Sequence, residues 1–113
     1  MIRRFVRSVI HNAMVTTGDG SSAMSLRIDP VLMQAMEVRP FEEVEIVNIA
    51  TGDRFVTWIE EGETGEVRVR HVRAGDVITI LSTALLQDGQ TLSHRAKSIT
   101  LDALNRIVSL TES

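Results

Sequence analysis

The sequence contains no cysteine and no tyrosine, and its only aromatic (FWY) side chains are three phenylalanines and one tryptophan. The absence of cysteine excludes a disulfide, a thiolate nucleophile and a zinc–thiolate site. It also fits a cytosolic protein. Because rings are so scarce, a hydrophobic core must be built from Val, Ile, Leu and Met. With 43% hydrophobic and 24% charged residues, the composition is typical of one globular domain spanning residues 1–113.

Long apolar runs are also lacking. No stretch approaches the roughly 18 residues that a membrane helix needs. The basic start, MIRRFVR, is not followed by the apolar segment of a signal peptide. A net charge of −3 disfavours nucleic acid as the main partner. We therefore expect a cytoplasmic protein that acts on a small molecule, with neither a nucleic-acid nor a membrane partner.

What the sequence does contain is alternation of β-branched and polar residues, which predicts a mostly β fold. One short helix is expected at about residues 30–37, where Asp29 can cap it and Pro30 suits its first position. Many short strands in one compact chain favour a barrel. The expected strands lie at residues 3–10, 13–17, 25–28, 44–50, 54–60, 66–71, 76–82, 98–101 and 106–110.

Three patterns in the sequence suggest a nucleotide, metal or hydrolytic site, but none matches the requirements of that site well. Residues 18–23, GDGSSA, satisfy the glycine pattern of a dinucleotide loop, yet they lead into a predicted strand rather than a helix. The three histidines match no metal-binding spacing, so no metal site is predicted. His11, Ser25 and Asp29 supply the residue types of a hydrolytic triad, a combination that most sequences contain.

Five segments together resemble bacterial aspartate 1-decarboxylase, the pyruvoyl-dependent enzyme that makes β-alanine for pantothenate. They are MIRRFVRSVIHNAMVT, SLRIDPVLMQAMEV, EVEIVNIATGDRFVTWI, AGDVITIL and ITLDALNRIV. The resemblance implies a small double-psi β-barrel. It also implies a homo-oligomer, a tetramer, with active sites between subunits.

The chemistry that the resemblance implies centres on Ser25. The family's proenzyme cuts its own chain at a Gly-Ser bond, and the serine becomes a pyruvoyl group that serves as an electron sink. Here Met24 stands where the family has glycine. Self-cleavage needs a strained backbone, which glycine adopts more readily than methionine does. We therefore expect Ser25 to remain an ordinary serine and the protein to have no cofactor; the alternative is a pyruvoyl group made from Ser25.

Other family positions are partly kept. By resemblance, Arg54 grips the substrate carboxylate and Thr57 assists self-processing, while Val9 replaces a lysine and Trp58 replaces a proton-donating tyrosine. Ser22 replaces a second tyrosine, and about five residues are missing between positions 70 and 73. These changes predict a pocket that is more open and more apolar than the family's.

Our main hypothesis from the sequence is a divergent family member that acts without a cofactor on a larger, partly apolar molecule. The reaction would be a cyclisation, cycloaddition or rearrangement in specialised metabolism, driven by orientation of the substrate. The alternatives are a pyruvoyl-dependent aspartate 1-decarboxylase and a non-catalytic binding or regulatory module. The candidate catalytic residues are Arg54, Thr57, Ser25 and His11, and the candidate substrate-binding residues are Trp58, Val9 and Arg54.

Overall fold

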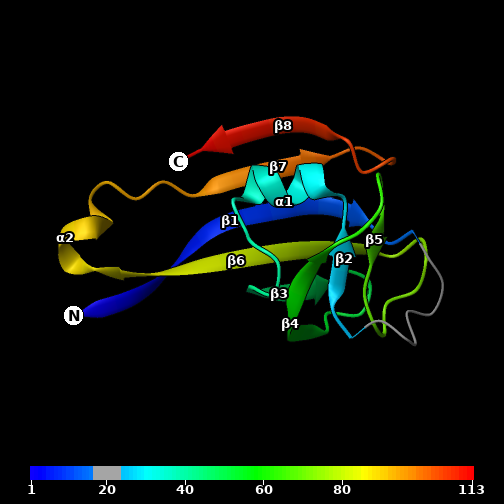
Figure 1. Cartoon of the computed structure of the whole chain (residues 1–113), viewed down its shortest axis with the longest axis horizontal. Coiled ribbons are helices and arrows are strands. Elements are labelled where there is room, and N and C mark those ends of the chain that lie inside the picture. Colours follow the sequence, from blue (N-terminus) through cyan, green and yellow to red (C-terminus); the bar gives the residue numbers. More distant parts are fainter. Residues whose placement is uncertain (17–23) are drawn as a thin grey trace.

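The computed structural model describes residues 1–16 and 24–113. In these residues the chain forms eight strands and two short helices (Figure 1). In chain order they are β1 (Ile2–Met14), β2 (Leu26–Ile28), α1 (Pro30–Met36), β3 (Glu43–Asn48), β4 (Arg54–Glu61), β5 (Val67–Arg68), β6 (Val77–Gln87), α2 (Asp88–Thr91), β7 (Lys97–Leu101) and β8 (Ile107–Glu112). No helix among them is both long enough and apolar enough to cross a membrane.

The strands form one curled sheet in the order β5-β2-β4-β3-β6-β1-β7-β8. β1 pairs antiparallel with β6 and parallel with β7, and β2 pairs parallel with β4. α1 packs against β1 and β7 (Figure 1). This mostly β architecture, with α1 as the predicted short helix, agrees with a small double-psi barrel, as the sequence predicts.

The core is aliphatic, as the shortage of aromatic residues requires. Ile46, Ile80, Ile10 and Ile99 stand opposite one another on four adjacent strands, and each is fully buried. Leu32 and Met36 from α1 cover the same core. Burying such side chains contributes about 1.5–3 kcal/mol each, so this row is a main source of the fold's stability.

α1 forms where the sequence predicts it. Asp29 caps the helix, since its Oδ1 accepts the backbone N–H of Val31 at 2.8 Å, and Pro30 follows at the first helical position. Glu37 ends the helix in a left-handed conformation with φ of 60°. The second carboxylate oxygen of Asp29 accepts the N–H of Gly65 at 2.9 Å. The helix start is thereby tied to the loop that follows β4.

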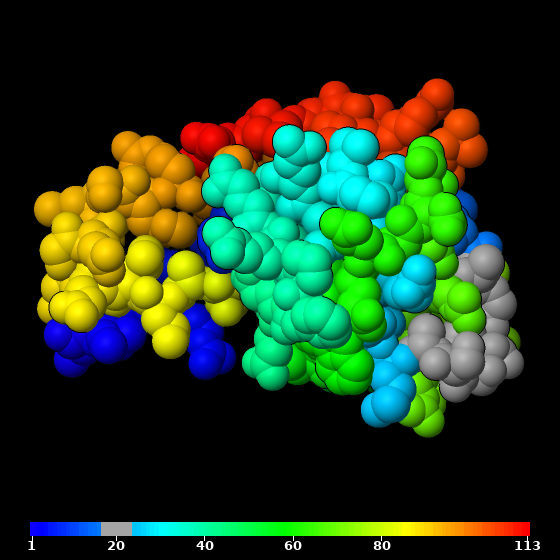
Figure 2. Space-filling view, in the orientation of Figure 1, coloured from blue at the N-terminus to red at the C-terminus, as the bar shows by residue number. Residues whose placement is uncertain are grey.

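β1 is one long strand, whereas the sequence predicts two shorter ones. The reason is a bulge between Ile10 and Ala13, at which Asn12 takes a φ of 65° and interrupts the alternation. β6 likewise continues beyond its predicted end. The outer halves of β1 and β6 form a two-stranded arm that extends from the main body, visible as a separate lobe in Figure 2.

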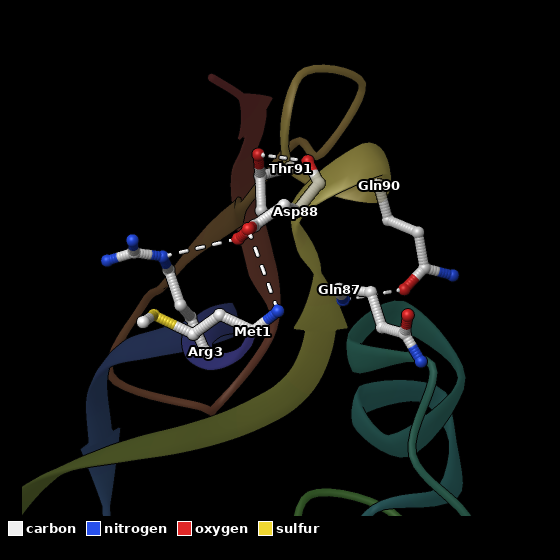
Figure 3. A network of polar contacts seen from close by, with 6 residues as sticks. All are labelled: Met1, Arg3, Gln87, Asp88, Gln90 and Thr91. Atoms are coloured by element: carbon white, nitrogen blue, oxygen red, sulfur yellow. Dashed lines mark hydrogen bonds and ion pairs between the residues drawn. The ribbon is translucent and has the colours of Figure 1, made fainter.

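The tip of the arm carries α2, which the sequence does not predict (Figure 3). Asp88 accepts ion-pair contacts from the amino terminus of Met1 and from Arg3. The N–H of Gln87 donates to Gln90 Oε1 at 2.9 Å, and the Thr91 hydroxyl donates to the Asp88 carbonyl. The ion pairs of Asp88 join residues distant in sequence and are exposed, so they contribute little stability and no local sequence pattern predicts them.

The strand predicted at residues 66–71 is shorter in the structure, where it is β5 (Val67–Arg68). β5 pairs with β2 and not with β4, so residues 61–65 do not form a hairpin. The chain crosses over β2 instead: Gly62 N–H donates to the Ile28 carbonyl at 2.7 Å, and Asp29 N–H donates to the Glu66 carbonyl at 3.0 Å. This crossing brings the acidic residues of the loop beside the end of β2.

Candidate active site

A pocket of about 490 Å³ lies where the chain enters β2, beside the end of β4. Its lining is largely polar, since five of its eight side chains are charged. The lining residues are Met24, Ser25, Arg27, Trp58, Glu60, Glu63, Glu66 and Arg68. The sequence predicts a more apolar pocket. The difference arises because the loop that crosses β2 and the outward face of β4 both place carboxylates here.

Thr57 fixes the backbone at the Met24–Ser25 bond. The parallel register that sets Leu26 opposite Ile59 brings the residues just before β2 alongside the middle of β4. Thr57 faces inward with only 8% of its surface exposed, and its hydroxyl donates to the Met24 carbonyl oxygen at 2.7 Å. By the resemblance found in the sequence, this carbonyl belongs to the bond that would be the family's cleavage site. A donor in this position polarises the carbonyl towards attack by a nucleophile.

Ser25, which the resemblance predicts to become the cofactor, is the next residue, and it is buried, with 4% of its surface exposed. Ser25 lines the pocket together with Glu60, and its hydroxyl stabilises the ionised form of that carboxylate. Trp58 Nε1 donates to Glu60 Oε2 at 3.1 Å. The hydrogen bond from Ser25, then the one from Trp58, together with the nearby charge of Arg27, hold the pKa of Glu60 below its usual value, although burial partly opposes them.

Glu60 is therefore a site residue that the sequence reasoning missed. Trp58 was predicted to bind the substrate, and in the structure it is half-buried with its indole N–H donating to Glu60. Side chains two apart on a strand share a face. An acidic residue two positions after Trp58 was the available signal.

Three predicted site residues lie away from Ser25 within the chain. Arg54, at the start of β4, is exposed and ion-paired with Glu45, with Nε donating to Oε1 at 2.7 Å. His11, on β1, bonds to Ser98 Oγ at 3.1 Å through Nε2. Val9 lies two residues before His11 on β1 and faces outward on the same side of the sheet. The single chain thus groups Ser25, Thr57 and Trp58 but leaves these three apart.

The triad residue types do not form a triad. Asp29 caps α1, His11 contacts Ser98 and Ser25 contacts Glu60. Within residues 1–16 and 24–113, no three His, Asp or Glu side chains come together as metal ligands. The glycine-rich segment at 18–23, including Ser22, lies outside the described residues.

Comparison with known proteins identifies the family. A family model described as aspartate decarboxylase matches residues 1–108. The chain belongs to the aspartate decarboxylase family.

Relatives named aspartate 1-decarboxylase align over nearly the whole chain. The one from Shouchella clausii (strain KSM-K16) is 36% identical, with 97% of this chain and 92% of the relative covered. The one from Listeria monocytogenes (strain EGD-e) is 34% identical, with coverages of 95% and 90%. The one from Syntrophomonas wolfei is 36% identical, with coverages of 97% and 99%. Aspartate decarboxylase homology therefore extends over both the Ser25 region and β4.

Proposed function

We propose that the protein is a self-processing amino-acid decarboxylase in which Ser25 becomes a pyruvoyl group, with L-aspartate as the substrate. The observation that carries this proposal is the hydrogen bond from the Thr57 hydroxyl to the Met24 carbonyl, beside the buried Ser25. The relatives' name, aspartate 1-decarboxylase, supports the choice of substrate. This is the alternative left open by the sequence. The cofactor-free cyclase and the binding module gain no support from the charged pocket.

The residues around the Met24–Ser25 bond are suited to forming a pyruvoyl group from Ser25. Attack by Ser25 Oγ on the Met24 carbonyl carbon, with breakage of the Met24–Ser25 amide, gives an ester and a free amine. Elimination then removes the Ser25 Cα proton and releases Met24 with a new carboxylate, leaving an unsaturated residue 25. One water converts this residue to pyruvoyl, and ammonia leaves. The net change consumes one water and needs no oxidant or metal.

A pyruvoyl carbonyl at position 25 would supply the electron sink for loss of CO₂. The chain's own residues bind and orient the substrate around it. Arg27 presents a guanidinium to the pocket, and a guanidinium pairs well with a substrate carboxylate. Trp58 forms part of the wall beside Ser25 and limits how a substrate can lie.

A second copy of the chain would complete this site. Arg54, Val9 and Val56 share the outward face of the sheet, and Val56 is 62% exposed. An exposed aliphatic face that carries an arginine is suited to contact another protomer. We propose a homo-oligomer, a tetramer by resemblance, in which Arg54 of one copy reaches the Ser25 pocket of the next. Light scattering at several protein concentrations tests it, and a stable monomer would contradict it.

The decarboxylase proposal is tested by supplying L-aspartate to the purified protein and measuring β-alanine and CO₂. Wild-type protein should form both in equal amounts, and Ser25→Ala should form neither. Processed protein that yields no product from L-aspartate would show that the substrate is different. Product formation undiminished in Ser25→Ala would contradict the role of Ser25 itself.

Replacing Met24 with glycine should accelerate cleavage at residue 24 by about tenfold, since a strained backbone conformation costs an L side chain about 1–3 kcal/mol more than it costs glycine. The Met24 side chain is 59% exposed, so its loss should not disturb the core. The time course of fragment formation by gel or mass spectrometry measures the effect. Val31→Ala, also at a 59% exposed position, is the matched control and should cleave at the wild-type rate.

A further inference from the structure

Glu60 lies in the same pocket as Ser25, the nucleophile of the proposed self-processing reaction. Ser25, Glu60 and Trp58 line one pocket, Trp58 Nε1 donates to Glu60 Oε2 at 3.1 Å, and the parallel register sets Arg27 of β2 opposite Glu60. The Ser25 hydroxyl stabilises the ionised form of the same carboxylate. Thr57 contacts the other partner of the reaction, the Met24 carbonyl. Nucleophile, proton acceptor and carbonyl donor therefore surround one peptide bond, which is the arrangement that activates a hydroxyl for acyl transfer.

We propose that Glu60 is the general base of self-processing and that Trp58 is a positioning residue that holds its carboxylate. This inference rests on the proposed function, because it requires that Ser25 attacks the Met24 carbonyl. Glu60 acts during self-cleavage, before decarboxylation of any substrate begins. Glu60 acts on the Ser25 hydroxyl, whose oxygen is the attacking atom.

The proton can be followed through the first step. As Ser25 Oγ bonds to the Met24 carbonyl carbon, its proton passes to the Glu60 carboxylate. The carbonyl π electrons move to the oxygen that Thr57 holds. When the carbon–nitrogen bond breaks, Glu60 returns the proton to the Ser25 nitrogen, which leaves as a free amine. Glu60 ends the step ionised, as it began.

The other carboxylates of the pocket are placed differently. Glu66 Oε1 accepts the backbone N–H of Glu63 at 2.7 Å, so that carboxylate is committed to its own loop. Glu63 is exposed at the outer part of the same loop. The cations facing the pocket are Arg27 from β2 and Arg68 from β5. Of the three glutamates, Glu60 is the one whose pKa the Ser25 hydroxyl lowers.

The direct test compares cleavage of freshly synthesised chains in cell-free translation, sampled over time by mass spectrometry. Glu60→Gln keeps the side chain's size and removes its basicity, so cleavage should slow by about 10²-fold. Glu63→Gln makes the same charge change in the same pocket and should cleave within about twofold of wild type. Cleavage of Glu60→Gln at the wild-type rate would overturn the role of Glu60 while leaving the proposed function intact. A wild-type chain that never cleaves would overturn both.

A pH profile supplies a second readout that a purely structural role would not move. Cleavage needs ionised Glu60, so the wild-type rate should fall as the pH drops through the lowered pKa of Glu60. Trp58→Phe removes one hydrogen-bond donor and raises this pKa, so the fall should begin at higher pH. The charges of Arg27, Arg68, Glu63 and Glu66 stay constant between the two proteins. An unshifted profile in Trp58→Phe would contradict the assignment, even if Glu60→Gln failed to fold.

Discussion

Replacing Thr57 with valine is expected to slow cleavage between Met24 and Ser25 by about 10³-fold. Valine has nearly the same shape and suits an inward-facing strand position, so the main loss is the hydroxyl that donates to the Met24 carbonyl at 2.7 Å. Without this donor, the negative charge that develops on the carbonyl oxygen during attack has lost its stabilising partner. The rate of fragment appearance from freshly made chains measures the effect.

Thr57→Ser is the matched control, since it keeps the hydroxyl and removes a methyl group. It should retain cleavage within about tenfold of wild type, because a buried methyl is worth only about 1 kcal/mol. Valine and serine variants that cleave equally fast would show that the hydrogen bond in the structure does not contribute to the reaction. Thermal unfolding of both variants would confirm that each keeps the fold.

Replacing Asn105 with alanine should destabilise the protein by about 3 kcal/mol. Asn105 is 2% exposed, and its side chain accepts from Met14 N–H at 2.8 Å and donates to the carbonyls of Met14 and Gly65 at 2.9 and 3.0 Å. Its φ of 60° is left-handed, which asparagine tolerates better than alanine does. The substitution therefore leaves three backbone groups without this partner and adds strain.

Denaturant unfolding at one fixed protein concentration measures this loss, since an oligomer's stability depends on concentration. Ser109→Ala, at an exposed position on β8, should change the unfolding free energy by no more than about 0.5 kcal/mol. A loss below about 1 kcal/mol for Asn105→Ala would mean that water replaces its three contacts. The ties from β1 to the loop after β4 would then be weaker than the geometry indicates.

Local signals in the sequence predict the helix and most strands correctly. Asp29 and Pro30 mark the start of α1, and alternation marks β3, β4 and β7, because capping and strand periodicity depend on neighbouring residues. The break predicted in β1 was wrong because Asn12 sits in a bulge. The pairing of β2 with β4 and β5 joins segments distant in sequence, which no local pattern specifies.

The site was predictable in part. Resemblance predicted Ser25 and Thr57 as site residues, and the Thr57 hydroxyl donates to the Met24 carbonyl next to Ser25. Glu60 was missed because only the parallel pairing of β2 with β4 brings Ser25 close to it. Glu60 shares its face of β4 with Trp58. The predicted roles of Arg54, Val9 and His11 remain predictions, since these residues lie away from Ser25 within one chain.

The intact mass of the purified protein under denaturing conditions tests the central claim most directly. The account predicts two fragments, residues 1–24 and 25–113, with the second lighter by one ammonia than a fragment that begins with serine. Ser25→Ala should give one uncut chain. A wild-type protein found only at the full mass of 113 residues would contradict the account, because Ser25 would then be an ordinary serine and no pyruvoyl group would form.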